Sequence, residues 1–216
     1  SESVKEYYST LFKNNDLVRV YNGIDISQIH VTKYRTSGTF RMLLIGRLSP
    51  EKSQKHAILA CSELLKSGRN NFVLDIWGEG SDYENLVNLI KSLNLEKYIK
   101  MKGYGNSIPI HEYDLGLNCT IYEAFGRVTV EYMLSGIPVV GSDSGGTKEI
   151  ISKDTGALYR KDNFISCFEA LSLFYDDRLL CKRMGLAGRL RATSLFSEQS
   201  YFSNIIAQYE KINSEK

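Results

Sequence analysis

The sequence of 216 residues lacks the marks of a membrane-spanning or secreted protein. No apolar run approaches the roughly 18 residues of a spanning helix, and residues 1–6 lack the charged-then-apolar order of a signal peptide. The four cysteines form no Cys-x-x-Cys pair and have no histidine close by in sequence, which argues against a zinc knuckle: Cys61, Cys119, Cys167 and Cys181. We therefore expect four reduced thiols, no transmembrane segment and a cytoplasmic protein.

A strong charge of one sign is also absent. Lys and Arg number 27 against 25 Asp and Glu, and a net charge of +2 is too small to indicate nucleic acid as a partner. The hydrophobic fraction of 43% is ordinary for a globular protein that buries a core. The chain begins without methionine, so we expect it to be a fragment or processed form of a longer protein.

What the sequence does contain is an alternation of apolar runs and helical patterns. The runs predict strands at 40–45, 72–77, 98–102, 115–119 and 137–141. The helical patterns lie at 53–67, 82–93, 127–135, 163–175, 176–192 and 197–213. A helix at 4–13, a strand at 17–21, a loop at 143–146 and a helical turn at 148–152 complete the prediction. The spacing predicts an α/β fold, a Rossmann-like open parallel sheet flanked by helices.

Two loops that follow predicted strands could carry chemistry. In the first, Arg47 and Lys52 lie at the mouth of the sheet just before a helix, a combination that suits a pyrophosphate. In the second, Glu123 lies in a loop, and Glu131 lies about one turn into the next helix. Taken singly, the first loop is equally compatible with a solvated basic segment, and either Glu with an exposed carboxylate.

Taken together, five motifs resemble the C-terminal domain of family 4 glycosyltransferases. In chain order they are Val20–Asp25, Ile45–Leu48 with Glu51 and Lys52, Glu123–Gly126 with Glu131, Gly136–Val140, and Ser144–Gly146. Members of this family are retaining enzymes with two Rossmann-like domains, the GT-B fold, so the resemblance implies one half of a two-domain architecture. It divides the chain into 1–22 as a remnant of the N-terminal domain or interdomain segment, 23–195 as the nucleotide-sugar-binding domain, and 196–216 as a C-terminal helix.

The resemblance also implies roles for individual residues. Arg47 and Lys52 match the diphosphate-binding cations, Glu123 matches the Glu that faces the donor sugar, and these three are the expected catalytic residues. Glu131 matches the Glu that accepts hydrogen bonds from the ribose hydroxyls. Further donor contacts are expected from Gly46, Phe125, Gly126 and Arg127, and base contacts from Lys102 and Tyr104.

The expected function is donor binding in a retaining glycosyltransferase that moves a sugar from a nucleoside diphosphate sugar, with UDP favoured, to a glycan or lipid-linked acceptor. Bacterial surface polysaccharide synthesis is the implied setting, with the full-length enzyme peripheral at the inner membrane face. The partner is a missing N-terminal acceptor domain, without which the chain is expected to be inactive. No cofactor and no metal are expected, since Arg47 and Lys52 can supply the positive charge and the sequence contains no Asp-x-Asp motif.

Other readings stay open beside this one. The chain could instead be a non-catalytic module of the same fold, a nucleotide-sugar epimerase or a phosphorylase. His56 is expected in a surface or packing role and His111 in a loop, while Trp77 fits either the core or the edge of the cleft. Tyr132 stands where the family usually has Ala and fits either packing behind its helix or a surface position.

Overall fold

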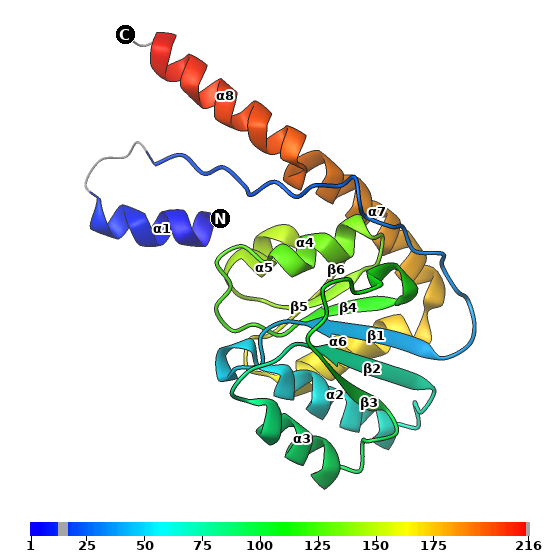
Figure 1. The fold of residues 1–216 in the computed structure, drawn as a ribbon. Coiled ribbons are helices and arrows are strands. Elements are labelled where there is room, and N and C mark those ends of the chain that lie inside the picture. Colours follow the sequence, from blue (N-terminus) through cyan, green and yellow to red (C-terminus); the bar gives the residue numbers. More distant parts are fainter. Residues whose placement is uncertain (13–16, 215–216) are drawn as a thin grey trace.

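A computed structural model describes residues 1–12 and 17–214. Six parallel strands form one sheet in the order β3-β2-β1-β4-β5-β6 (Figure 1). The strands are β1 (Phe40–Ile45), β2 (Phe72–Trp77), β3 (Ile99–Gly103), β4 (Leu115–Asn118), β5 (Val139–Ser142) and β6 (Gly156–Tyr159). The chain moves outward from β1 to β3 and then returns to β4 on the other side of β1. The carboxyl ends of β1 and β4 therefore flank a topological switch point, where open α/β sheets bind ligands.

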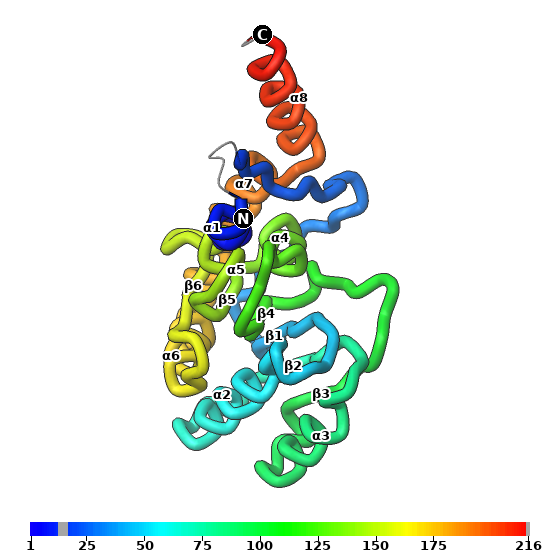
Figure 2. The backbone as a smooth tube through the Cα atoms, turned by 90° about the vertical axis from the view of Figure 1, so that its left-hand side faces the viewer, coloured from blue at the N-terminus to red at the C-terminus, as the bar shows by residue number. Residues whose placement is uncertain are grey.

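Helices cover both faces of the sheet. They are α1 (Glu2–Leu11), α2 (Gln54–Lys66), α3 (Tyr83–Ser92), α4 (Arg127–Leu134), α5 (Gly145–Ile150), α6 (Phe164–Asp176), α7 (Arg178–Phe196) and α8 (Glu198–Ser214), with 3-10 turns η1 (Pro50–Lys52) and η2 (Ile110–Glu112). In both views α1 lies beside α5, and α8 projects away from the sheet beyond α7 (Figures 1 and 2).

Alternate residues of β1 supply two separate cores. Phe40, Met42 and Leu44 lie in a core shared with α2, α3 and α6. Leu43 lies in the other core, with residues of α4, α5 and α7. Because successive side chains of a strand point to opposite faces, a strand buried on both faces must be apolar throughout. This explains the nearly continuous apolar run of β1.

Tyr132 of α4 connects the second core to the end of β1. Its side chain is fully buried, and its hydroxyl accepts the N–H of Ile45 at 2.8 Å. The ring occupies space that is free because residue 116 is glycine, since a Cβ there would lie 2.3 Å from the Tyr132 ring. The packing alternative for Tyr132 is therefore the one that the structure shows.

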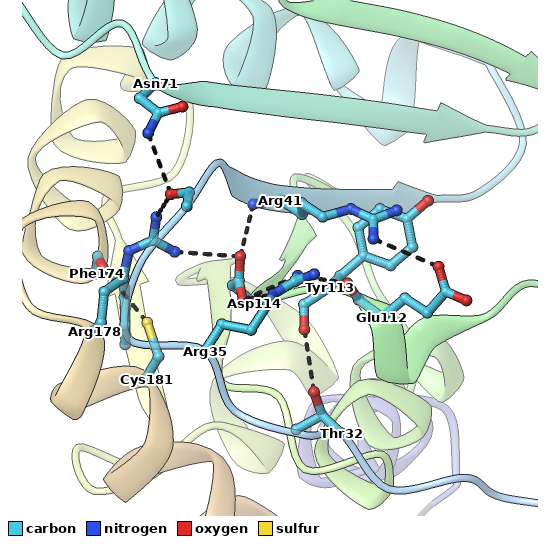
Figure 3. Close-up of polar contacts among 11 residues, drawn as sticks. Thr32, Arg35, Arg41, Asn71, Glu112, Tyr113, Asp114, Phe174, Arg178 and Cys181 are labelled. Atoms are coloured by element: carbon cyan, nitrogen blue, oxygen red, sulfur yellow. Dashed lines mark hydrogen bonds and ion pairs between the residues drawn. The ribbon is translucent and has the colours of Figure 1, made fainter.

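A buried carboxylate joins three parts of the chain at the amino ends of the central strands β1 and β4 (Figure 3). Asp114 accepts hydrogen bonds from the Arg41 N–H of β1 at 2.8 Å, from Arg35 at 3.2 Å and from Arg178 of α7 at 3.2 Å. Its side chain is only 7% exposed. The segment before β1 and the start of α7 are thus fixed to the same strand end.

The structure departs from the predicted local structure at three places. Residues 17–21 form no strand, and the nearest pairing is a single bridge between Ile24 and Ser197. The helical turn predicted at 148–152 is present as part of a longer helix, α5, which starts at Gly145 inside the predicted loop and ends at Ile150. Strand β6 was not predicted. Of the predicted helix at 4–13, residue 13 lies outside the described residues.

The cysteines agree with the sequence analysis, since all four are free and buried. At the start of α8, the Ser197 hydroxyl accepts the N–H of Ser200 at 3.3 Å, so Ser197 caps this helix.

Candidate functional site

Three neighbouring pockets lie around the carboxyl end of β1. The cation pocket, of about 270 Å³, is lined by residues that include Gly46, Arg47, Lys52, Gln54 and Glu123. The histidine pocket, of about 610 Å³, includes His30, His111, Arg127 and Glu131. The tryptophan pocket, of about 300 Å³, includes Arg47, Trp77 and Tyr104. Because Ile45 lines all three, the pockets adjoin at the switch point of the sheet.

The loop after β1 is fixed by the loop after β2. The Gly46 N–H donates to the Trp77 carbonyl at 3.0 Å, and the Leu48 N–H donates to the Glu79 carbonyl at 2.8 Å. Gly78 has φ +145°, and a Cβ there would lie 1.9 Å from the Gly46 carbonyl oxygen. Glycine at 78 therefore lets the two loops touch, which fixes the backbone that carries Arg47.

Lys52 and Glu123 meet in the cation pocket. Lys52 Nζ lies 3.1 Å from Glu123 Oε2, with side-chain exposures of 27% and 18%. The Ile121 N–H donates to the Glu51 carbonyl at 2.9 Å, so the two loops are also joined through their backbones. The structure thus brings together two predicted residues that are far apart in sequence.

Arg47 lines the same pocket but makes a different contact. Its Nη2 lies 2.8 Å from Glu51 Oε1, and its side chain is 70% exposed. The nearby backbone N–H of Glu51, the Ser49 hydroxyl and the Arg47 guanidinium hold the pKa of the Glu51 carboxyl below its usual value. Since the Arg47 guanidinium is mostly in solvent, little packing would hold it to Glu51 if an anionic ligand entered the pocket.

Glycines shape the 119–126 loop, which follows β4. Gly126 precedes α4 with φ +98°, and no side chain in the described part of the chain caps that helix. The Gly146 N–H donates to the Glu123 carbonyl at 2.7 Å, and a Cβ at Gly145 would lie 2.1 Å from that same oxygen. The Ser-Gly-Gly motif therefore lets α5 support the loop closely, while the first N–H groups of α4 stay open to a ligand.

Asn118 anchors the start of this loop and was missed by sequence reasoning. Its amide donates to Thr129 Oγ1 at 2.8 Å and to Thr147 Oγ1 at 3.3 Å, and its oxygen accepts the Thr120 N–H at 3.1 Å. The sequence did offer one signal, namely a polar residue at the end of an apolar strand. A buried amide needs hydrogen-bond partners, so such a residue indicates contacts with neighbouring segments.

Glu131 lies apart from Glu123. It lines the histidine pocket, and its Oε1 accepts a hydrogen bond from Arg127 Nε at 3.1 Å. Arg127 lines both the histidine and the cation pocket, so it stands between the two carboxylates. The two carboxylates thus face different pockets.

Trp77 lines the third pocket together with Tyr104, which is 69% exposed. Trp77 Nε1 lies 3.4 Å from the Tyr113 hydroxyl, which donates to Asp75 Oδ2 at 2.8 Å. Burial raises the pKa of Tyr113 to about 12, so this hydroxyl keeps its proton at neutral pH. Lys102 lies over the indole, with Nζ 5.5 Å from the ring centroid. Trp77 takes both of the positions considered for it, since it is partly buried against the second core and also lines this pocket.

The histidines take different positions. His56 is 5% exposed and packs against Tyr159, with Nδ1 3.4 Å from the hydroxyl, in agreement with a packing role. Burial lowers the pKa of His56. The His111 ring lies next to the His30 ring, with the centroids 5.1 Å apart and the ring planes tilted by 34°, and both side chains line the histidine pocket. His30 was not singled out from the sequence, because its neighbour lies about 80 residues away.

Residues 1–12 and 17–214 contain neither a candidate metal cluster nor a candidate membrane-spanning helix. No group of three or more His, Cys, Asp or Glu side chains is placed to hold a metal ion. No helix in these ranges is both long and apolar enough to cross a membrane.

Residues 27–191 match the family model described as "Glycosyl transferases group 1". The chain belongs to this family. The motif resemblance found in the sequence is thereby confirmed. The group 1 relatives include the glycogen synthase of Mycobacterium tuberculosis, 27% identical over 191 residues, which cover 86% of this chain and 46% of that protein.

Another group 1 relative comes from Campylobacter jejuni. It is the N-acetylgalactosamine-N,N'-diacetylbacillosaminyl-diphospho-undecaprenol 4-alpha-N-acetylgalactosaminyltransferase, 30% identical over 186 residues, which cover 80% of this chain and 48% of that protein. The chain thus spans about half the length of the curated relatives it matches.

Among solved structures, HepE of Anabaena in complex with UDP-glucose superposes with a TM-score of 0.85. It is 23% identical, and the match covers 98% of this chain and 62% of that chain. At this identity the likeness shows the fold, and the Rossmann-like α/β architecture predicted from the sequence is confirmed.

Proposed function

We propose that this chain is the donor-binding domain of a retaining, metal-independent glycosyltransferase that uses a nucleoside diphosphate sugar, with a UDP-sugar favoured. The observation that carries the proposal is the meeting of Lys52 and Glu123, 3.1 Å apart, in a pocket at the switch point of the sheet. A cation and a carboxylate there match the two ends of a donor, since diphosphate needs positive charge and sugar hydroxyls need an acceptor.

The three pockets offer binding positions for the diphosphate, the ribose and the base of the donor. The diphosphate would lie in the cation pocket, where Lys52, Arg47 and the open N–H groups of α4 are near. The ribose would lie at Glu131 in the histidine pocket, and the base toward Tyr104 and the tryptophan pocket. The UDP-glucose named in the HepE structure supports the choice of donor.

The chemistry follows from where charge develops. As the glycosidic bond breaks, the departing nucleoside diphosphate gains negative charge, and preorganised donors at that position stabilise the transition state by about 3 kcal/mol each. When the donor binds, the Lys52 ammonium would exchange its ion pair with Glu123 for one with the phosphate. The Glu123 carboxylate would then accept a hydrogen bond from a sugar hydroxyl. Retention follows from the family resemblance: the acceptor attacks from the same face, and the leaving phosphate helps to take its proton.

The acceptor and the rest of the enzyme are part of the same proposal. The diphospho-undecaprenol in the name of the Campylobacter relative supports a glycan or lipid-linked acceptor in bacterial surface polysaccharide synthesis. Residues 23–195 would form the donor domain, and an N-terminal domain outside this chain would bind the acceptor. Transfer of sugar by the purified chain alone would contradict this division.

Nucleotide binding tests the proposal directly, and Trp77 is the only tryptophan of the chain. Titration with UDP, GDP and ADP, followed by tryptophan fluorescence and calorimetry, is expected to show binding, tightest for UDP, that EDTA leaves unchanged. Lys52→Ala and Arg47→Ala are each expected to weaken UDP binding about 10- to 100-fold, because each removes a charge-assisted contact worth about 1.5–3 kcal/mol.

The matched control is Lys55→Ala, which removes an exposed lysine three residues from Lys52. Its UDP affinity is expected to equal that of the wild type. No binding of any nucleotide, or equal loss in Lys52→Ala and Lys55→Ala, would overturn the proposal.

A further inference from the structure

Glu149 of α5 joins α1 to the sheet domain, although no motif assigned it a role. Its carboxylate accepts the N–H of Glu2 at 2.8 Å and the N–H of Ser3 at 3.1 Å. These are the first two residues of α1, whose N–H groups have no partner within their own helix. A carboxylate at a helix N-terminus also interacts favourably with the helix dipole. The contact is therefore a charge-assisted anchor between two segments far apart in sequence.

The same small region contacts the 119–126 loop. The Ser1 hydroxyl donates to the Ala124 carbonyl. The Tyr21 hydroxyl lies 3.4 Å from Glu149 Oε2, and the Tyr21 ring lies 6.0 Å from the ring of Phe125. Phe125 is 8% exposed, so its side chain is held in the core while its backbone belongs to the loop. Residues before the sheet domain thus pack behind the loop that faces the proposed donor.

Glu149 itself is held firmly. Arg191 of α7 donates to the Glu149 carbonyl at 3.0 Å and to the Ile150 carbonyl at 3.0 Å. At the other end of the same short helix, Gly146 donates to the Glu123 carbonyl. One helix of six residues therefore supports the loop at its start and holds α1 near its end.

We propose that Glu149 is a positioning residue that couples the segment before the sheet domain to the 119–126 loop. By holding α1 and Tyr21 against Phe125 and Ala124, it keeps the loop backbone in the conformation that binds the donor. The consequence for binding rests on the proposed function, whereas the mechanical coupling does not.

The test compares hydrogen exchange and UDP affinity in wild type, Glu149→Gln and Glu149→Ala. For Glu149→Ala we expect the hydrogen-exchange rate of the Ala124–Gly126 amides to rise about tenfold, because the loop backbone would open locally more often. UDP affinity is expected to fall about fivefold or more, the size of an ordinary coupling between sites. Glu149→Gln keeps one acceptor oxygen, so we expect a smaller rise in exchange and a smaller loss of UDP affinity than in Glu149→Ala.

A matched pair at Glu2 probes the same contact from the other side and serves if Glu149→Ala does not fold. Both Glu2→Pro and Glu2→Gln remove the ion pair with Arg19, but only the proline also removes the N–H that Glu149 accepts. Proline is well tolerated at the first position of a helix. We expect faster exchange at the loop in Glu2→Pro and wild-type exchange there in Glu2→Gln.

The proposal is overturned if α1 exchanges faster in Glu149→Ala and Glu2→Pro while the Ala124–Gly126 amides do not. It is also overturned if the loop loosens and UDP affinity stays the same. If the wild type binds no nucleotide, the proposed function fails, and the exchange comparison alone then decides whether α1 and the loop are coupled.

Discussion

The hydroxyl of Tyr132 satisfies a backbone N–H at the end of β1, directly before the loop that carries Arg47. Tyr132→Phe removes the acceptor of the Ile45 N–H, and the Tyr132 side chain that supplies this acceptor is fully buried. We expect the free energy of unfolding to fall by about 1–3 kcal/mol. Urea denaturation followed by circular dichroism measures it.

Tyr175→Phe is the matched control for Tyr132→Phe. The Tyr175 hydroxyl also accepts a backbone N–H, that of Asn71 at 3.1 Å, but at an exposed position where water can replace it. Its loss is expected to be below about 0.5 kcal/mol. Equal losses in the two variants would show that burial does not set the size of the effect.

His56 gives the stability a dependence on pH. Burial lowers its pKa below the ordinary value of 6.5, so the unfolded chain binds more protons than the folded one between the two pKa values. Stability therefore falls as the pH drops through about 6.5, and the loss is complete below the folded-state pKa. We expect unfolding free energies measured from pH 8 to pH 5 to fall less steeply in His56→Gln. Parallel curves would contradict this role.

The predictability of single residues depended on whether their partners are local. Lys52 and Glu123 could be proposed from the sequence because each lies in a motif beside a strand end. The contacts of Asn118 and Glu149 could not be proposed, because the partners of Asn118 come from α4 and α5 and those of Glu149 from α1. Whether the predicted donor residues bind a nucleotide stays a prediction.

At the scale of elements, α2 and α3 end in the same way with different residues. Gly68 (φ +84°) and Asn94 (φ +55°) follow them in the left-handed conformation. The next N–H in each case, of Arg69 or Leu95, donates back into the helix at 2.9 Å. Such an ending favours glycine, which has no Cβ to oppose it.

Exchanging these residues tests the ending. Asn94→Gly is expected to raise the free energy of unfolding by about 0.5 kcal/mol, since relief of left-handed strain exceeds the added entropy of the unfolded chain. Gly68→Asn is expected to lower it by about as much, and no atom within 4 Å obstructs the new Cβ. Thermal or urea denaturation of both variants measures the shifts. Changes of the same sign would contradict the explanation.

Elements were predictable where periodicity was strong, as for β1 and α2. Strand β6 was missed because Gly156–Tyr159 is short and starts with glycine, so pairing with β5 defines it more than composition does. Residues 17–21 look like a strand but have no sheet edge to pair with. There Arg19 lies over the Tyr21 ring, and Tyr21 packs against Phe196. Propensity gave way to tertiary context in both cases.

At the scale of the whole molecule, Asp114 joins β1, the segment before it and α7. Asp114→Ala removes the carboxylate and leaves Arg178, whose side chain is 15% exposed, without its ion-pair partner. We expect a loss of about 3 kcal/mol in the free energy of unfolding, measured with urea. The control is Glu112→Gln. The Glu112 carboxylate is 50% exposed and lies 3.5 Å from Arg41, so its removal is expected to lower the free energy of unfolding by less than about 0.5 kcal/mol.

The strand order has a consequence for synthesis on the ribosome. β1 can pair with β2, and β2 with β3, as soon as these strands emerge, but the other edge of β1 waits for β4, because Met42 pairs with Leu115. Until then one edge of an apolar strand is open to other chains. Long-range parallel pairing is also intrinsically slow. Nascent chains that stop before residue 115 are therefore expected to depend on chaperones, and release from them should coincide with the arrival of β4.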